Sequence, residues 1–285
     1  MTTHANAMTV DVEDYFHVAA LAKTISRKDW DAMEFRAERS TDRLLEMFAE
    51  KDVKATFFVL GWVARKAPAL IRRIHAAGHE VACHGLTHEL VYRQTPALFL
   101  EETRISKQML EDTVGVPVIG YRAASYSITA QSLWALDVLC DLGFKYDSSI
   151  FPIAHDRYGI PGASTRPGPI RAPNGKQIVE FPLSTKGVLG RRVPVAGGGY
   201  FRLLPYWFTR WALTGVNRAD DLPFVFYLHP WEIDPEQPRF ENASWLSRFR
   251  HYNNLEVCES RLRALIGDFR FSTMRDVLRP HLEAA

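Results

Sequence analysis

The chain has 285 residues, of which 47% are hydrophobic and 24% are charged, and this composition predicts a large buried core in one domain. The formal net charge is +2, with both signs mixed along the chain, which argues against a nucleic-acid partner because that function needs a basic stripe. The sequence offers no run of about 18 apolar residues to span a bilayer. Its first seven residues lack a charged start followed by an apolar core, so a cytoplasmic location is expected.

The first predicted element is a short apolar strand over residues 9–12, which is followed at once by acidic residues. Asp11, Glu13 and Asp14 lie so close together that they repel one another unless a cation or an arginine compensates them. A helix N-cap or a solvated turn would also account for them. The segment alone leaves both interpretations open.

Further apolar strands alternate with amphipathic helices along the chain. Strands are predicted over residues 55–60, 80–83, 120–123, 178–181 and 224–228. Helices are predicted over 43–50 with a cap at 40–42, from Pro68 to a stop at Gly78, from Pro96 to about Thr113, and over 130–142 before Gly143. This alternation is typical of a parallel α/β sheet with crossover helices, and the number of strands favours a barrel.

His84 and His88 follow the strand predicted over residues 80–83. Two imidazoles four residues apart can close on one divalent cation, although two ordinary histidines would also fit this spacing. One carboxylate from residues 11–14 would complete the three protein ligands of a catalytic zinc-type site and leave a position for water. Another acid would remain free for proton transfer.

Residues 148–200 are dense in proline and glycine and are predicted to form an irregular insertion, either a plain surface excursion or a lid over the substrate. The rings of residues 206–211 recur at helical spacing and are predicted to be mainly core. Residues 242–285 are predicted to form a helical C-terminal extension. The three cysteines cannot all pair and are expected to be buried thiols.

Four of these motifs resemble those of the polysaccharide deacetylases of the NodB-homology type, carbohydrate esterase family 4. The resemblance rests on the acidic strand end, on His84-Gly-Leu-Thr-His88, on Gly120-Tyr-Arg-Ala-Ala-Ser-Tyr126 and on Phe224-Val-Phe-Tyr-Leu-His229-Pro-Trp-Glu232, in family order. It implies a single domain over residues 1–285, folded as a distorted (β/α)7 barrel.

Three segments look more narrowly like a subgroup linked to exopolysaccharide synthesis and exosortase-type gene clusters. They are residues 11–17, residues 197–201 and residues 250–255. The likeness spans nearly the whole chain and is weakest between residues 150 and 200.

The resemblance also implies roles for single residues. Asp11 would be the general base, His229 the general acid, and Arg122 the partner that orients Asp11. Tyr126 and Trp231 would line the substrate site, and Asp147 would either orient a catalytic histidine or cap a turn.

The metal ligands implied by the resemblance are His84, His88 and one acid. The adjacent Asp-Asp of the family's first motif is replaced here by Asp11-Val-Glu-Asp14. Strand alternation puts Glu13 on the face of Asp11, whereas a direct replacement would make Asp14 the ligand and Glu13 the base. Asp11 is favoured as base, with Glu13 and Asp14 as competing ligands.

The expected activity is removal of N-acetyl groups from an amino-sugar polysaccharide or oligosaccharide, or from its lipid-linked precursor, with Zn²⁺ or else Co²⁺ or a similar ion as cofactor. Two alternatives are an allantoinase-like hydrolase of cyclic amides and a catalytically inactive carbohydrate-binding barrel. The first can work without metal, which the intact histidine pair opposes. The second predicts loss of the base or the acid, and both are present.

Overall fold

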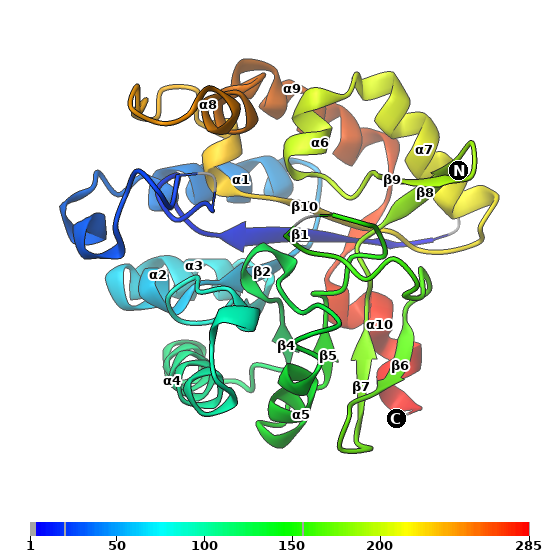
Figure 1. The fold of residues 1–285 in the computed structure, drawn as a ribbon. Coiled ribbons are helices and arrows are strands. Elements are labelled where there is room, and N and C mark those ends of the chain that lie inside the picture. The colour runs from blue at the N-terminus through cyan, green and yellow to red at the C-terminus, as the bar shows by residue number, and fades with distance from the viewer. Residues whose placement is uncertain (1–3, 20, 156, 285) are drawn as a thin grey trace.

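A curled sheet forms the centre of the structure, which is a computed structural model describing residues 4–19, 21–155 and 157–284. Within these ranges seven parallel strands lie in the order β10, β1, β2, β3, β4, β5, β7. Their bounds are Val225–Leu228, Asn6–Val12, Thr56–Val59, Glu80–Cys83, Gly120–Tyr121, Tyr146–Asp147 and Gln177–Glu180. The predicted seven-stranded α/β barrel is therefore confirmed, as an incompletely closed sheet (Figure 1).

Two more strands extend the sheet and two form a separate hairpin. β6 (Gly168–Arg171) pairs antiparallel with β7, and β11 (Phe271–Ser272) pairs parallel with β1. β8 (Thr185–Val188) and β9 (Arg191–Pro194) pair only with each other among the described strands. The proline- and glycine-rich segment is therefore more regular than expected, because short antiparallel pairs satisfy its backbone.

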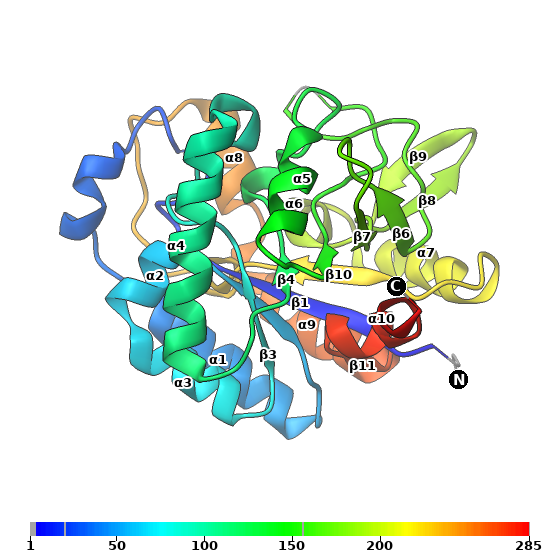
Figure 2. The ribbon, with the colours of Figure 1, turned by 90° about the horizontal axis from the view of Figure 1, so that it is seen from below.

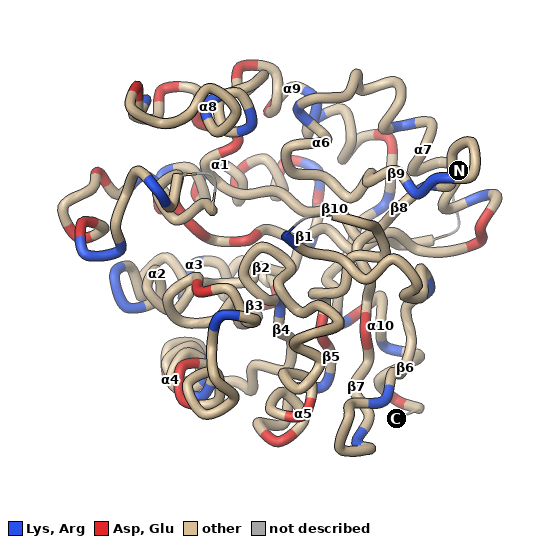
Figure 3. The backbone as a smooth tube through the Cα atoms, in the orientation of Figure 1, with Lys and Arg blue, Asp and Glu red and all other residues tan. Residues whose placement is uncertain are grey.

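Ten α-helices are present in the described residues, and most of them cover the outside of the sheet (Figure 2). They are α1 (Ala37–Glu50), α2 (Gly61–Lys66), α3 (Pro68–Ala76), α4 (Pro96–Val114), α5 (Trp134–Asp141), α6 (Gly198–Leu203), α7 (Tyr206–Arg218), α8 (Trp245–Tyr252), α9 (Leu255–Asp268) and α10 (Met274–Glu283). None of them is both long and apolar enough to cross a membrane. Lysine and arginine are interspersed with aspartate and glutamate along the backbone (Figure 3).

Both faces of the sheet are packed in its middle, which explains why β1 to β5 and β10 are buried throughout. Along β2, Phe57 and Val59 join the core under the outer helices, while Phe58 points into the smaller core inside the curl. This alternation has the period of two that a strand imposes.

The last helix closes the amino-terminal end of the curl. The backbone N–H of Met274 donates to Thr56 Oγ1 at 2.7 Å, and that of Arg275 donates to Glu80 Oε2 at 3.0 Å. Thr56 and Glu80 are the first residues of β2 and β3. Because this end is covered, a ligand must approach from the carboxyl ends of the strands, where the chemistry of such barrels lies.

Three local predictions need correction. Helix α1 begins at Ala37, not after a cap at residues 40–42, because a remote carboxylate caps it. Helix α5 begins at Trp134, four residues later than expected. In α7, Trp207 and Trp211 are 69% and 52% exposed, so these rings are not core.

Candidate metal and catalytic site

Glu13, His84 and His88 form a buried cluster at the carboxyl ends of β1 and β3. Each offers one ligand atom, and these atoms all lie within 4.8 Å of one another. Glu13 follows the end of β1 and His84 directly follows β3. The intervening loop turns back sharply, with left-handed φ angles of 75° at Gly85 and 54° at His88, a conformation that non-glycine residues adopt rarely and that concentrates at functional sites.

The donor atoms of this cluster fit a divalent cation. His84 Nδ1 lies 2.8 Å from the carbonyl oxygen of Arg122, so Nδ1–H donates there and Nε2 is left for a ligand role. Buried Glu13 Oε2 accepts no well-directed hydrogen bond, although His88 Nε2 lies only 2.8 Å away. Two imidazoles and a carboxylate are a typical donor set for catalytic zinc.

Electrostatics keep these groups in the forms that bind metal. Burial lowers the pKa of His84, which favours the neutral ring. Burial would raise the pKa of Glu13, but the neighbouring His88 and His229 outweigh it and lower that pKa well below its usual range. The cluster therefore combines an ionised carboxylate with a neutral imidazole.

Asp14, the competing ligand, is not brought into this cluster. Its Oδ2 accepts the backbone N–H groups of Arg36 and Ala37 at 2.6 and 2.7 Å, and its Oδ1 accepts that of Tyr15 at 2.8 Å. Both carboxylate oxygens therefore already accept hydrogen bonds, Oδ2 from the start of α1 and Oδ1 from the turn after β1. Burial raises the pKa of Asp14 to about 6, although these N–H groups oppose the shift.

Asp11 and Arg122 form a fully buried ion pair beside the cluster. Arg122 Nη1 donates to Asp11 Oδ1 at 2.7 Å and to Thr9 Oγ1 at 2.8 Å, and Nε and Nη2 donate to the backbone and side-chain oxygens of Ser148. The other Asp11 oxygen, Oδ2, lies 3.4 Å from the hydroxyl of Tyr126. The arginine thus holds one oxygen of Asp11 and leaves the other facing the site.

His229 directly follows β10 and faces the same carboxylates. Its Nε2 lies 3.4 Å from Glu13 Oε1 and 3.9 Å from Asp11 Oδ2. Burial would lower the pKa of His229, but Glu13 and Glu232 outweigh it and raise that pKa to about 9. Without a bound ion, both ring nitrogens of His229 therefore carry a proton at neutral pH. The ring thus has a proton to donate, as a general acid requires.

These groups open into a cavity of about 200 Å³. Its lining includes Asp11, Glu13, His84, His88, Tyr126, His229 and Trp231. Trp231 stacks on His229 with ring centroids 5.1 Å apart, and its indole N–H approaches Glu13 Oε1 at 3.5 Å. All the predicted site residues except Asp14 thus lie in or against one cavity, with Arg122 behind Asp11.

Two residues that the sequence did not single out complete the surroundings of His229. Glu232 Oε2 lies 3.0 Å from His229 Nδ1, and Arg202 Nε donates to Glu232 Oε1 at 2.7 Å. Asp147, the sequence candidate for orienting a histidine, instead accepts from the hydroxyl of Ser149. A glutamate three residues after a histidine, across Pro230, was the available signal for Glu232.

Two family models match neighbouring stretches of the chain, both after Asp11 and Glu13. The family model "Polysaccharide deacetylase" matches residues 29–146, and "Domain of unknown function (DUF3473)" matches residues 148–279. The first stretch holds His84, His88 and Arg122, and the second holds His229. Both stretches therefore contribute to the one cavity described above.

The relatives cover only part of the chain, whereas the similar folds cover nearly all of it. A chitooligosaccharide deacetylase from Sinorhizobium fredii is 39% identical over 101 residues, which are 35% of this chain and 44% of that protein. The chain thus matches less than half the length of the first curated relatives.

Two solved structures share the fold. One from Mycobacterium smegmatis has a TM-score of 0.66 at 21% identity and covers 99% of this chain and 91% of its own. Puue allantoinase has a TM-score of 0.64 at 14% identity, with 99% and 90% covered. At these identities the likeness concerns the fold alone. Residues 29–146 of this chain are therefore similar to the polysaccharide deacetylases in sequence, and the whole described chain shares its fold with the two solved structures.

Proposed function

We propose that this protein is a metal-dependent deacetylase that removes N-acetyl groups from an amino-sugar polysaccharide or its lipid-linked precursor in bacterial exopolysaccharide biosynthesis. The observation that carries the proposal is the shared cavity, in which a Glu-His-His donor set lies beside a carboxylate and a protonated imidazole. The deacetylase relatives support the same reaction class.

Glu13, His84 and His88 would hold the cation, which is Zn²⁺ or an ion of similar preference. When bound, it would polarise the acetamide carbonyl and lower the pKa of a nearby water molecule. The orphaned Oε2 of Glu13 supports this ligand assignment over Asp14, whose two oxygens are already used.

The chain's own residues would move the protons. Asp11 Oδ2 would take a proton from the attacking water. The carboxylate is oriented for this by the hydrogen bond that Arg122 donates to Oδ1, which leaves Oδ2 facing the site. As the carbon–nitrogen bond of the acetamide breaks, His229 Nε2 would give its proton to the departing amine. The products are acetate and a free amino sugar, so atoms and protons balance.

The three segments that resemble the exopolysaccharide-linked subgroup also converge on this cavity. Residues 11–17 supply Asp11 and Glu13, while Gly199 and Arg250 come from the other two segments and line the cavity wall. This convergence supports a substrate peculiar to that subgroup.

The test is metal analysis followed by an acetate-release assay on N-acetylated glucosamine oligomers. The proposal predicts about one divalent ion per chain, release of acetate, loss of activity with a chelator, and recovery when Zn²⁺ or Co²⁺ is added back. Undiminished turnover after complete chelation, or hydrolysis of allantoin without release of acetate, would contradict it. Bound metal without acetate release from any glycan would favour a binding barrel.

A further inference from the structure

The imidazole of His229 is held from behind by Glu232. His229 Nδ1 lies 3.0 Å from Glu232 Oε2, and the same oxygen accepts the backbone N–H of His229 at 3.0 Å. An ionised carboxylate can only accept hydrogen bonds, so Nδ1 carries a proton and Nε2 is the atom presented to Asp11 and Glu13. This is the arrangement by which a carboxylate fixes the tautomer of a catalytic histidine.

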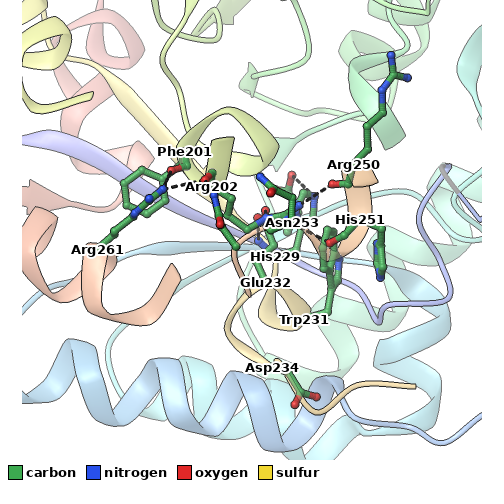
Figure 4. A network of polar contacts seen from close by, with 12 residues as sticks. Phe201, Arg202, His229, Trp231, Glu232, Asp234, Arg250, His251, Asn253 and Arg261 are labelled. Atoms are coloured by element: carbon green, nitrogen blue, oxygen red, sulfur yellow. Dashed lines mark hydrogen bonds and ion pairs between the residues drawn. The ribbon is translucent and has the colours of Figure 1, made fainter. Parts of the chain in front are cut away.

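The second oxygen of Glu232 is held by Arg202. The Nε–Oε1 distance is 2.7 Å, and both side chains are almost fully buried. Arg202 Nη1 donates to the carbonyl oxygens of His251 and Asn253, and Nη2 donates to that of Arg250 (Figure 4). These carbonyls lie at the C-terminal end of α8, where the helix dipole favours a cation.

The motif before Arg202 explains how its helix reaches this position. Gly197 has a φ of 124°, and a Cβ atom there would collide with the carbonyl oxygen of Tyr227 in β10. Only glycine therefore allows α6 to start against this strand. From the other side, Arg261 Nη1 donates to the carbonyl oxygens of Phe201 and Arg202 at 2.9 and 2.8 Å (Figure 4).

We propose that Glu232 and Arg202 are positioning residues that hold His229 in the orientation and tautomer from which Nε2 donates a proton to the departing amine. The inference rests on the proposed deacetylase function. The proposal also gives a role to residues 197–202 and 250–255. They place and bind Arg202, which holds Glu232 against the proposed acid His229. The stretch of unknown function, residues 148–279, would thus supply the acid half of the site, and residues 11–122 the base and the metal ligands.

The decisive variant is Glu232→Gln. A glutamine has one acceptor oxygen, for which Arg202 Nε–H competes with the backbone N–H and Nδ1–H of His229. We expect the charged donor Arg202 to take it, so that the amide NH₂ group turns toward His229 Nδ1. That contact forces Nδ1 to accept, moves the single proton of the neutral ring to Nε2 and disfavours the doubly protonated ring. A neutral ring is a much weaker acid than a doubly protonated one, so its Nε2 proton is no longer given readily to the departing amine.

Kinetics on two substrates separate this effect from general damage. For N-acetylated glucosamine oligomers, kcat of Glu232→Gln should fall about 100-fold with KM within about twofold. For 4-nitrophenyl acetate, whose leaving group departs without a proton, kcat/KM should stay within about threefold. An equal fall on both substrates would overturn the positioning role.

A spectroscopic readout tests the proposal without any glycan substrate. In ¹⁵N-histidine-labelled protein loaded with Zn²⁺, the His229 ring, assigned by comparison with His229→Asn, should show a proton on Nδ1 in the parent and lose it in Glu232→Gln. A parent ring without the Nδ1 proton, or a ring unchanged by the substitution, would overturn the proposal. If no N-acetylated glycan is ever hydrolysed, the proposed function fails, while this measurement still decides the positioning.

Asp234→Asn is the matched control. Asp234 belongs to the same turn, and its carboxylate forms a buried ion pair with Arg36 at 2.6 Å and makes no described contact with His229 or Glu232. It should lower stability while kcat stays within about twofold and the His229 signal does not change. Arg202→Lys keeps the positive charge but cannot make all the hydrogen bonds that the guanidinium donates to the backbone carbonyl oxygens. This variant should lower kcat on the oligomers by about tenfold. Unchanged kcat in Arg202→Lys would remove Arg202 from the proposal.

Discussion

Arg122 Nη1 lies 2.7 Å from Asp11 Oδ1, and neither side chain is more than 2% exposed. The guanidinium carbon lies 4.1 Å from the centroid of the Phe58 ring, so an aromatic side chain also covers this buried pair. Because a buried charge left without its partner is costly, the proposed general base is tied to the stability of the fold.

Replacing Arg122 by Met should lower the free energy of unfolding by about 3–5 kcal/mol, since Asp11 would be left buried and unpaired. Urea denaturation of the two proteins measures the difference. Arg73→Met is the control, because Arg73 pairs with Asp42 at the surface and should cost no more than about 1 kcal/mol. Equal losses in the two variants would show that Arg122 does not neutralise Asp11.

Replacing Asp11 by Asn should abolish proton transfer without disturbing the cation. The amide oxygen can still accept from Arg122 Nη1, but the group no longer serves as a base, so kcat should fall by about 10²- to 10⁴-fold. Metal content, measured on the same preparation, should stay at the parent value. Loss of the ion in this variant would make Asp11 a ligand and would reverse the assignment.

The amide variants Glu13→Gln and Asp14→Asn separate a ligand from a helix cap. Changes to residues that only contact a metal ligand typically weaken metal binding about 10- to 100-fold. Glu13→Gln removes a proposed ligand and should weaken Zn²⁺ binding by more than this, as measured by competition with a zinc chelator. Asp14→Asn should keep the ion but lower stability by about 1–3 kcal/mol, because a backbone N–H at the start of α1 or in the turn loses its acceptor. The opposite pattern would identify Asp14 as the ligand.

His79 gives the protein a predictable sensitivity to acid. Its Nδ1 accepts the backbone N–H of Ala55 at 3.1 Å, and burial, with Lys54 nearby, lowers its pKa from 6.5 to about 4. The folded state therefore binds fewer protons than the unfolded state between these values, so stability is fully present above about pH 6.5 and falls as the pH falls toward 4.

His79→Asn keeps an acceptor but removes this titration. Urea denaturation at pH 7, 6, 5 and 4 should show a flatter decline than in the parent, by up to about 1.4 kcal/mol per pH unit. Parallel declines in the two proteins would mean that His79 titrates normally in the folded state.

The amino-acid sequence was enough to predict the fold class and the candidate residues that lie at strand ends. A strand's carboxyl end fixes where the next side chain points, so Asp11, His84, Arg122 and His229 could be assigned to one face of a parallel barrel. Asp11 is the last residue but one of β1, and His84, Arg122 and His229 each directly follow their strands.

Contacts between distant segments could not be predicted in the same way. Glu13 and Asp14 are neighbours of the same charge, and only the approach of Arg36 and Ala37 to Asp14 distinguishes them. Because the same contact caps α1 at Ala37, the helix begins earlier than the predicted cap at residues 40–42. Arg202 reaches Glu232 across 30 residues, through a helix that begins within a segment expected to be irregular.

The most direct test of the central claim is an anomalous-scattering map from crystals of the protein grown with Zn²⁺. We expect one strong peak about 2.0–2.2 Å from a carboxylate oxygen of Glu13 and from one ring nitrogen each of His84 and His88. A peak bound by Asp14 in place of Glu13, or zinc only at sites away from the histidine pair, would contradict it.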